Sequence, residues 1–332
     1  MVTKRIVSRL QVVLVGIILG ICVGTLGCVT TGSAQTTKEV EQASFQSMEN
    51  ILRDQAFQII NGPEWSDRLQ ADSIFTRTLV RTLRAKNSFR YAFDSLGTVS
   101  VLYAPDSTFK IFSWQLMKDP SYYRYKAAIQ YNTPDGSLRL TPLFDASPFT
   151  DQPCDSVRDA TQWIGQLYYN ILLHQYQGKS YYTLLGYDEN DETTTRKWVD
   201  VLTFNEQGQP RFGGLFFEYL PDDKKPPIPT YRFLFEYKKN AGARMNYDPD
   251  LQLITFAKLV SEKGNPAVHA TLVPEGGYEG FKWVKGKWVH VALVAELDPN
   301  PQINPPKETP APAKAAPAKP APTLPKKKNN GQ

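Results

Sequence analysis

The sequence contains none of the short motifs that identify common catalytic or nucleotide-binding sites. It has no P-loop, no Gly-x-Gly-x-x-Gly turn, no Cys-x-x-Cys or His-Glu-x-x-His motif and no Gly-x-Ser-x-Gly elbow. The 332 residues include only three histidines, His174, His269 and His290, each in or beside an expected strand. A single histidine in a strand is more often a packed side chain than a base or metal ligand, so these absences argue against an enzyme.

The chain also lacks an excess of positive charge in its central part. The formal net charge is +5, but residues 1–34 contribute +3 and residues 301–332 contribute +5. Residues 35–300 therefore carry a net charge of −3. A domain without net positive charge has no general attraction for a phosphate backbone, so no nucleic-acid partner is expected.

Cysteine is equally scarce, with three residues at positions 22, 28 and 154. The first two fall in the segment that is interpreted below as an export signal, so a processed chain would keep Cys154 alone. No intramolecular disulfide is then possible, even in an oxidising compartment. Cys154 has no histidine near it in the sequence, which favours a partly buried, unreactive thiol over a catalytic one.

The first 34 residues are typical of an export signal. Lys4, Arg5 and Arg9 precede an apolar run over residues 12–26, and the small residues at 32–34 follow it. We therefore expect cleavage after Ala34 and an exported protein that is periplasmic or associated with the cell envelope.

Two other outcomes of processing remain open. The tetrapeptide Thr25-Leu26-Gly27-Cys28 is similar to a bacterial lipobox, which would make Cys28 the lipidated first residue, although its leucine stands one place late. The apolar run could instead stay uncut as an anchor, but it is short for a membrane span of about 20 residues. Membrane association is expected only if Cys28 is lipidated or the signal is not cleaved.

Residues 35–88 are expected to form a helical hairpin. Apolar side chains recur every three or four positions over residues 36–60, and Asn61-Gly62-Pro63 ends this pattern. A second helix over residues 64–86 would turn one apolar stripe inward, formed by Leu69, Phe75, Leu79 and Leu83. Its other side carries Arg77, Arg81 and Arg84. An anionic ligand or surface could use these arginines, but a solvated helix face is the simpler interpretation.

Residues 89–297 are expected to form a mainly β domain, an antiparallel meander of roughly a dozen strands with a sandwich or barrel-like arrangement. Residues 163–219 contain four aromatic-rich segments separated by polar turns, and both faces of these segments are largely apolar. That pattern favours a sheet covered on both sides or curled into a barrel. Further strands are expected at residues 89–93, 99–103, 109–114, 122–131, 137–143, 230–238, 251–260, 281–284 and 287–293.

The segments between these strands are expected to be irregular. A short helix at residues 154–160, a rigid proline-rich loop at 221–229 and loops at 246–250 and 264–277 are indicated. The last segment, residues 298–332, is rich in proline, alanine and lysine and has too little apolar surface to offset the entropy of ordering. It is expected to be a disordered tail.

The acidic loop at residues 188–192 is the best ligand-binding candidate in the sequence. Asp188, Asn190, Asp191 and Glu192 offer oxygen ligands of the kind that calcium takes. The loop lacks the glycine that an EF-hand places at its sixth position, where this chain has Thr193. Acidic loops also keep strand ends soluble, so the metal is left open and no cofactor is expected.

Aromatic residues are the second signal, with doublets at Tyr122-Tyr123, Tyr168-Tyr169 and Tyr181-Tyr182. One ring of each doublet must leave the main core unless a second layer covers it. Exposed rings could stack on a glycan or on a partner protein. Filling both layers of a two-layer sheet is the alternative.

Four segments resemble uncharacterised exported proteins of Bacteroidetes-type Gram-negative bacteria. These segments are residues 109–114 (FKIFSW), 181–188 (YYTLLGYD), 197–202 (KWVDVL) and 280–291 (GFKWVKGKWVHV), and the resemblance covers about residues 89–293. It implies a location in the cell envelope and brings no known activity and no catalytic residues.

A non-catalytic binding or structural role is therefore expected, with an envelope protein or a glycan as partner. The alternative is an envelope hydrolase, or a calcium-dependent glycan-active protein that uses residues 188–192. His174 and Asp188 form the most obvious acid–base pair, but a hairpin that turns at residues 177–179 places His174 opposite Tyr182. Asp188 would then lie about 20 Å from His174 at the usual strand rise, beyond the reach of a hydrogen bond.

Overall fold

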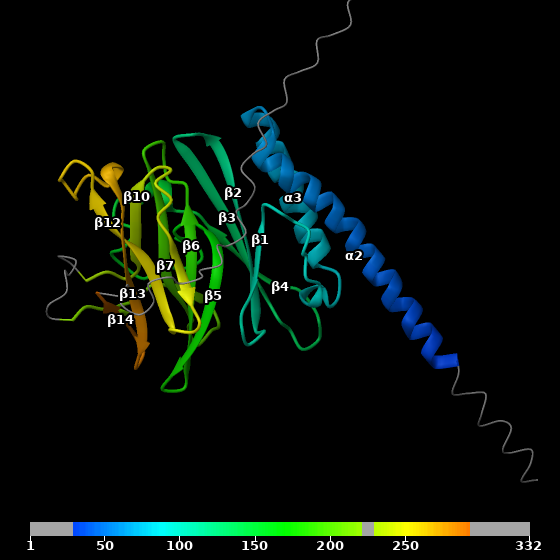
Figure 1. The fold of residues 1–332 in the computed structure, drawn as a ribbon. Helices are drawn as coiled ribbons and strands as arrows, with labels where there is room; N and C mark the ends of the chain where they lie inside the picture. The colour runs from blue at the N-terminus through cyan, green and yellow to red at the C-terminus, as the bar shows by residue number, and fades with distance from the viewer. Residues whose placement is uncertain (1–28, 221–228, 293–332) are drawn as a thin grey trace, which may run out of the picture.

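The computed structural model describes residues 29–220 and 229–292 and consists of four stacked layers (Figure 1). Two N-terminal helices form the first layer, and three β-sheets follow in chain order. The expected mainly antiparallel β architecture with an N-terminal helical hairpin is confirmed. The described strands form three open sheets rather than one closed barrel.

The helices are α2 (Val29–Asn61) and α3 (Trp65–Leu83), and short 3₁₀ helices lie at Ser88–Arg90, Ser147–Phe149 and His269–Thr271. The first sheet has the order β1 (Ser100–Tyr103), β2 (Phe109–Asp119), β3 (Tyr122–Tyr131) and β4 (Arg139–Phe144). The second has the order β10 (Phe233–Lys238), β7 (Thr194–Phe204), β6 (Lys179–Asp188) and β5 (Leu167–Tyr176), with β8 (Pro210–Phe212) also paired to β7. The third has the order β11 (Met245–Asp248), β12 (Leu253–Ser261), β13 (Leu272–Val284), β14 (Lys287–Val291) and β9 (Phe217–Glu218).

Three apolar cores separate the four layers. Successive side chains of a strand point to opposite faces, and β2 shows this directly. Phe112, Trp114 and Leu116 enter the core beneath the helices, whereas Phe109 and Ile111 enter the core against the second sheet. The first and second sheets are therefore buried on both faces, as the aromatic and apolar character of their strands predicts.

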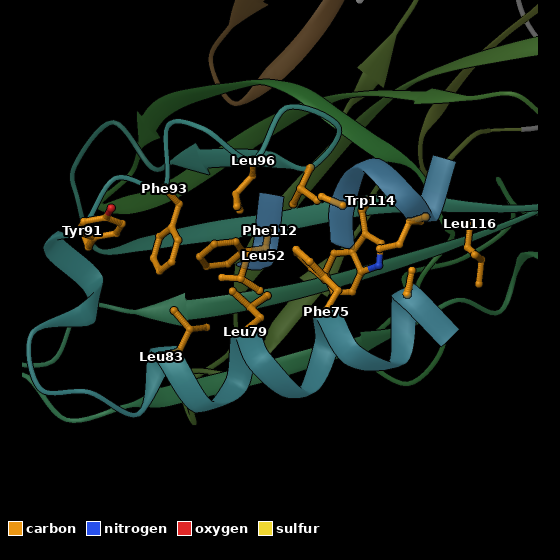
Figure 2. Close-up of a cluster of buried hydrophobic side chains, with 14 of the residues drawn as sticks. Leu52, Phe75, Leu79, Leu83, Tyr91, Phe93, Leu96, Phe112, Trp114 and Leu116 are labelled. Carbon is orange, nitrogen blue, oxygen red and sulfur yellow. The ribbon is translucent and has the colours of Figure 1, made fainter. Parts of the chain in front are cut away.

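The helical layer packs on the first sheet mainly through α3. Figure 2 shows Phe75 and Leu79 of α3 directed toward Phe112 and Trp114 of β2. The Phe75 and Trp114 rings meet edge to face, with centroids 5.1 Å apart. The inward stripe of the second predicted helix is confirmed except at Leu69, which is 43% exposed because it lies beyond the edge of this contact.

Several predicted boundaries are wrong. Residues 89–93 form the end of a 3₁₀ helix and a loop instead of a strand. The backbone is left-handed on both sides of this segment, with φ of 62° at Asn87 and 60° at Phe93. Residues 154–160 form turns and an isolated β-bridge at Arg158 instead of a helix, and Asp155 and Asp159 accept local hydrogen bonds that hold these turns. Residues 245–248 belong to β11, and β13 begins at Leu272 within the predicted loop over 264–277.

Two further strand predictions are corrected by the pairing. The fourth predicted strand of residues 163–219 is split between β8 in the second sheet and β9 in the third, where β9 pairs with β14 in parallel. His174 lies opposite Tyr181 rather than Tyr182, because the hairpin turns at Gln177-Gly178, both with positive φ. The first predicted helix is longer than expected, since α2 begins at Val29, so the predicted cleavage position falls within α2.

Some predictions fall on residues that the structure does not describe. They concern the apolar run at 12–26, lipidation of Cys28, most of the proline-rich loop at 221–229 and the tail at 298–332. Among the described helices, none is both long enough and apolar enough to span a membrane.

Lys110 is a completely buried cation on the helix-facing side of β2. Its ammonium donates hydrogen bonds to the carbonyl oxygens of Ser88, Phe89 and Tyr91, at 3.3, 3.1 and 2.8 Å. The Phe93 ring lies 4.8 Å from the same nitrogen. Lys110 therefore ties the loop that replaces the predicted strand to β2. Burial lowers the pKa of Lys110 to about 7.

The pH dependence of stability should report this lysine. In the unfolded chain Lys110 keeps the ordinary pKa of a lysine, so between about pH 7 and pH 10 the unfolded state binds a proton that the folded state does not. Unfolding then takes up a proton, and the contribution of Lys110 makes the folded state more stable as the pH rises. Urea unfolding of the wild type and of Lys110→Met at several pH values measures this contribution. Identical pH slopes in both proteins would show that Lys110 is not perturbed.

Candidate functional site

An apolar groove of about 700 Å³ lies between α3 and the first sheet. Its floor is formed by three neighbouring strands and its wall by one side of α3. Strand β2 contributes Trp114, Leu116 and Lys118, β3 contributes Tyr122, Arg124, Lys126 and Ala128, and β4 contributes Leu140, Pro142 and Phe144; Trp65, Leu69, Thr76 and Val80 come from α3. The register of the sheet places these strand residues side by side on one face.

The groove exists because the helices cover only part of the sheet. Both helices pack on β2, whereas neither makes an extended contact with β3 or β4. The groove face of β3 is small at Ala128, which pairs with Pro142 of β4. Neither residue fills the space below Thr76 and Val80, so a trough remains open beside the packed core.

The two ends of the groove differ in charge. Lys118, Arg124 and Lys126 lie toward the turn between β2 and β3, whereas Ala128, Leu140 and Val80 line the other end. The side chains of Arg124 and Lys126 are 38% and 41% exposed, so their charges reach the opening. One end of the groove is therefore cationic and the other is apolar.

Two buried carboxylates form ion pairs with two of these cations, Lys126 and Arg124. Asp72 of α3 forms an ion pair with Lys126 and accepts a hydrogen bond from Trp114 Nε1 at 2.9 Å. Asp145, directly after β4, lies 3.6 Å from Arg124 Nε and accepts the backbone N–H of Tyr125 at 2.9 Å. Each acid is about 1% exposed in its side chain, so the open side of each pair presents the cation.

A row of arginines borders the same groove. Arg77, Arg81 and Arg84 line a shallow depression on α3 together with Thr76 and Val80, which also line the groove. All three arginines are exposed. The stripe that the sequence indicates is thus present, and it adjoins an apolar site instead of an ordinary solvated surface.

A second cavity of about 590 Å³ lies between α2 and the loop after α3. Its lining is about half polar and half apolar and of mixed charge, with Glu41, Asp94 and Arg90. Its buried acid, Glu49, accepts hydrogen bonds from the Tyr91 hydroxyl and from the Ser95 backbone N–H. This carboxylate stabilises the loop, and the cavity lacks the group of cations that lines the groove.

The acidic loop forms a hydrogen-bonded turn. Asp188 is buried, which raises the pKa of its carboxyl to about 6, and it accepts the Asn190 backbone N–H at 2.8 Å. Asp191 accepts the backbone N–H groups of Thr193 and Thr194, and Glu192 points into solvent. Within the described residues, no three histidine, cysteine or acidic side chains are grouped to hold a metal ion.

The three histidines lie apart from the groove. His174 stacks on Trp283 at 4.7 Å between centroids, and burial lowers its pKa. His269 Nδ1 lies 3.1 Å from Glu236, and His290 Nε2 lies 3.1 Å from Glu279. These two histidine–carboxylate pairs have the geometry of an acid–base pair, but neither lines the groove or the polar cavity.

The remaining candidates are largely structural. Burial raises the pKa of the Cys154 thiol to about 11, which keeps it protonated and unreactive at neutral pH. The tyrosine doublets fill the two cores on either side of a sheet: Tyr168 and Tyr182 enter one core, and Tyr169 and Tyr181 pack against the other. Of the doublet rings, Tyr122 lines the groove.

The groove was not identified from the sequence, although part of its signal is visible there. Arg124 and Lys126 alternate with Tyr123 and Tyr125, so a strand at 122–131 puts both cations on one face. The position of α3 over β2, which leaves those cations beside an apolar trough, is set by packing between distant segments. No protein-family model, no curated protein and no solved structure matches the chain.

The Asp72–Lys126 pair should respond unequally to removal of its two members. Lys126→Ala leaves a buried carboxylate without its cation and should lower the free energy of unfolding by about 3 kcal/mol. Asp72→Asn keeps an oxygen for the Trp114 N–H and leaves a lysine that reaches water, so a loss of about 1 kcal/mol is expected. Urea unfolding at neutral pH compares the two. A larger loss for Asp72→Asn would contradict this account of the pair.

Proposed function

We propose that this protein is an exported, non-catalytic binding protein of the cell envelope whose groove takes an anionic amphiphile. The ligand class is a molecule with a long apolar chain and a carboxylate or phosphate head group. The observation that carries the proposal is the division of one groove into a cationic end and an apolar end. The location in the envelope rests on the signal-like first 34 residues and on the resemblance described above.

The apolar end supports the chain-binding part of the proposal. Small-molecule sites are concave, mostly apolar and equipped with a few polar groups that fix orientation. The groove has this composition, and its volume lies within the usual range for such sites, about 300–1,000 Å³. Leu140 and Val80 provide contacts for methylene groups, whose removal from water favours binding.

The cationic end supports the head-group part. Lys118, Arg124 and Lys126 offer N–H donors on one side of the groove, and the exposed halves of Arg124 and Lys126 are free to approach an anion. Guanidinium groups bind carboxylate and phosphate through paired hydrogen bonds. The carboxylates of Asp72 and Asp145 offset part of this positive charge, so an anion is favoured mainly by the N–H donors and by the charge of Lys118.

Binding rather than hydrolysis is proposed because the histidine–carboxylate pairs do not line the groove. An amphiphile held there would meet cations and apolar side chains, with no histidine among the lining residues. This ligand class takes the place of the envelope protein or glycan that the sequence led us to expect.

Ala128→Trp should block the apolar end of the groove. The indole would occupy the trough between β3 and α3, and the affinity for a fluorescent long-chain fatty acid should fall roughly tenfold, as expected when the chain contacts are lost. Fluorescence titration measures this affinity. Ala267→Trp, in an exposed loop after β12, is the matched control and should bind like the wild type. Circular dichroism verifies that both variants fold.

Lys118→Gln combined with Arg124→Gln tests the cationic end without filling it. This double variant should weaken binding of the fatty acid and leave binding of its uncharged methyl ester unchanged, because only the acid carries a negative charge. Lys282→Gln with Lys285→Gln, on the third sheet, provides a control of equal charge change. Absence of saturable fatty-acid binding by the wild type, or wild-type affinity in Ala128→Trp, would refute the proposed function.

A further inference from the structure

The opening of the groove has apolar residues on two sides, and both are exposed. Leu69 of α3 is 43% exposed, and Phe144 at the end of β4 is 58% exposed. Both line the groove, one on the helix wall and one on the sheet floor. Large apolar side chains that remain exposed at the mouth of a cavity indicate a contact surface.

Phe149 is a third exposed apolar side chain, on the segment that follows β4. It is 84% exposed, the most exposed of the large apolar side chains described, and it stands at the end of the 3₁₀ helix Ser147–Phe149. It is five positions along the chain from Phe144, so the two Cα atoms lie within about 17 Å of each other even if the chain between them is extended. The 3₁₀ turn is fixed by Asp145, whose Oδ1 accepts the Ser147 backbone N–H at 2.9 Å.

Positive charge lies on both sides of the groove. Arg77, Arg81 and Arg84 lie on the α3 side of the opening, and Lys118 and Arg124 lie on the strand side. Exposed acids lie near as well, with Asp67 on α3 and Asp151 two residues after Phe149. The opening therefore combines apolar tips with several cations that line or border the groove.

We infer that this opening, with Leu69 and Phe144 at its mouth, Phe149 on the segment that follows β4 and five cations on the two sides of the groove, docks on an anionic lipid bilayer. The apolar tips would enter the boundary between head groups and acyl chains, and the cations would pair with lipid phosphates. The inference rests on the proposed function, since a docked groove would receive an amphiphile directly from the bilayer. It also provides a membrane contact that requires neither lipidation of Cys28 nor an uncleaved signal.

Depth-dependent quenching by brominated lipids tests the docking in the full chain. Phe149→Trp places a fluorophore at the proposed contact, and Val260→Trp places one on β12 of the third sheet, where the native valine is 43% exposed. With phosphatidylglycerol vesicles, quenching at position 149 should exceed that at 260 roughly twofold or more, because only the first residue enters the bilayer. The difference between variant and wild-type spectra removes the contribution of the native tryptophans.

Charge is tested in the same assay. Quenching of Phe149→Trp should fall in phosphatidylcholine vesicles, and it should also fall when Arg77→Glu and Arg81→Glu are added, with melting temperatures confirming that these exposed substitutions leave the fold intact. Equal quenching at positions 149 and 260, or equal quenching by neutral and anionic vesicles, overturns the inference. Fatty-acid binding measured without vesicles separates the two proposals: if it persists while quenching at 149 is absent, docking alone fails, and if it is absent while quenching occurs, the binding function fails.

Discussion

Packing of α3 against one strand, β2, governs the part of the structure that carries the candidate site. Phe75 and Leu79 meet Phe112 and Trp114 there, and each of these side chains is at most 4% exposed. Because the inward side chains of α3 pack mainly on β2, they leave much of the face of β3 and β4 uncovered, although Asp72 still reaches Lys126 of β3. The groove is therefore a direct consequence of where the helix lies on the sheet. Its floor is the helix-facing side of β3 and β4, and the same side of the neighbouring strand β2 forms the packed core.

Polar groups buried between the layers fix how these layers align. Lys110 bridges β2 to the loop after α3, and Asp72 bridges α3 to β2 and β3 through Trp114 and Lys126. Deeper in the molecule, Arg232 and Asp200 form a fully buried ion pair in the second sheet, 3.2 Å apart. Apolar packing tolerates sliding, whereas a buried ion must find its partner, so such groups favour one arrangement of the layers over its neighbours.

The strands and turns could be predicted because they depend on residues close together in the sequence. The candidate site could not, because it depends on packing between segments far apart in the chain. The strand at 122–131 and the hairpin at Lys285-Gly286 follow from alternation and turn residues close in sequence. Apolar side chains also alternate along residues 89–93, yet this segment folds as a loop. The carbonyl oxygens of Phe89 and Tyr91 accept hydrogen bonds from the Lys110 ammonium instead of from a neighbouring strand. The composition of the acidic loop predicts a ligand site, but the carboxylate oxygens of Asp188 and Asp191 accept hydrogen bonds from backbone N–H groups of the same loop. Arg124 and Lys126 line a groove only because α3, some fifty residues earlier in the chain, forms its opposite wall.

The outer strand of the first sheet also shapes what can approach it. The backbone N–H of Phe144 lies on the edge of β4 that does not pair with β3, and it donates to the carbonyl oxygen of Ala160 at 2.8 Å. Pro142 lies two residues earlier on the same edge and has no N–H to offer. The edge beside the groove therefore provides few donors for another strand, and addition of a second chain to the sheet is discouraged. The molecule can keep an apolar trough open at the margin of a sheet without exposing that margin as a template for aggregation.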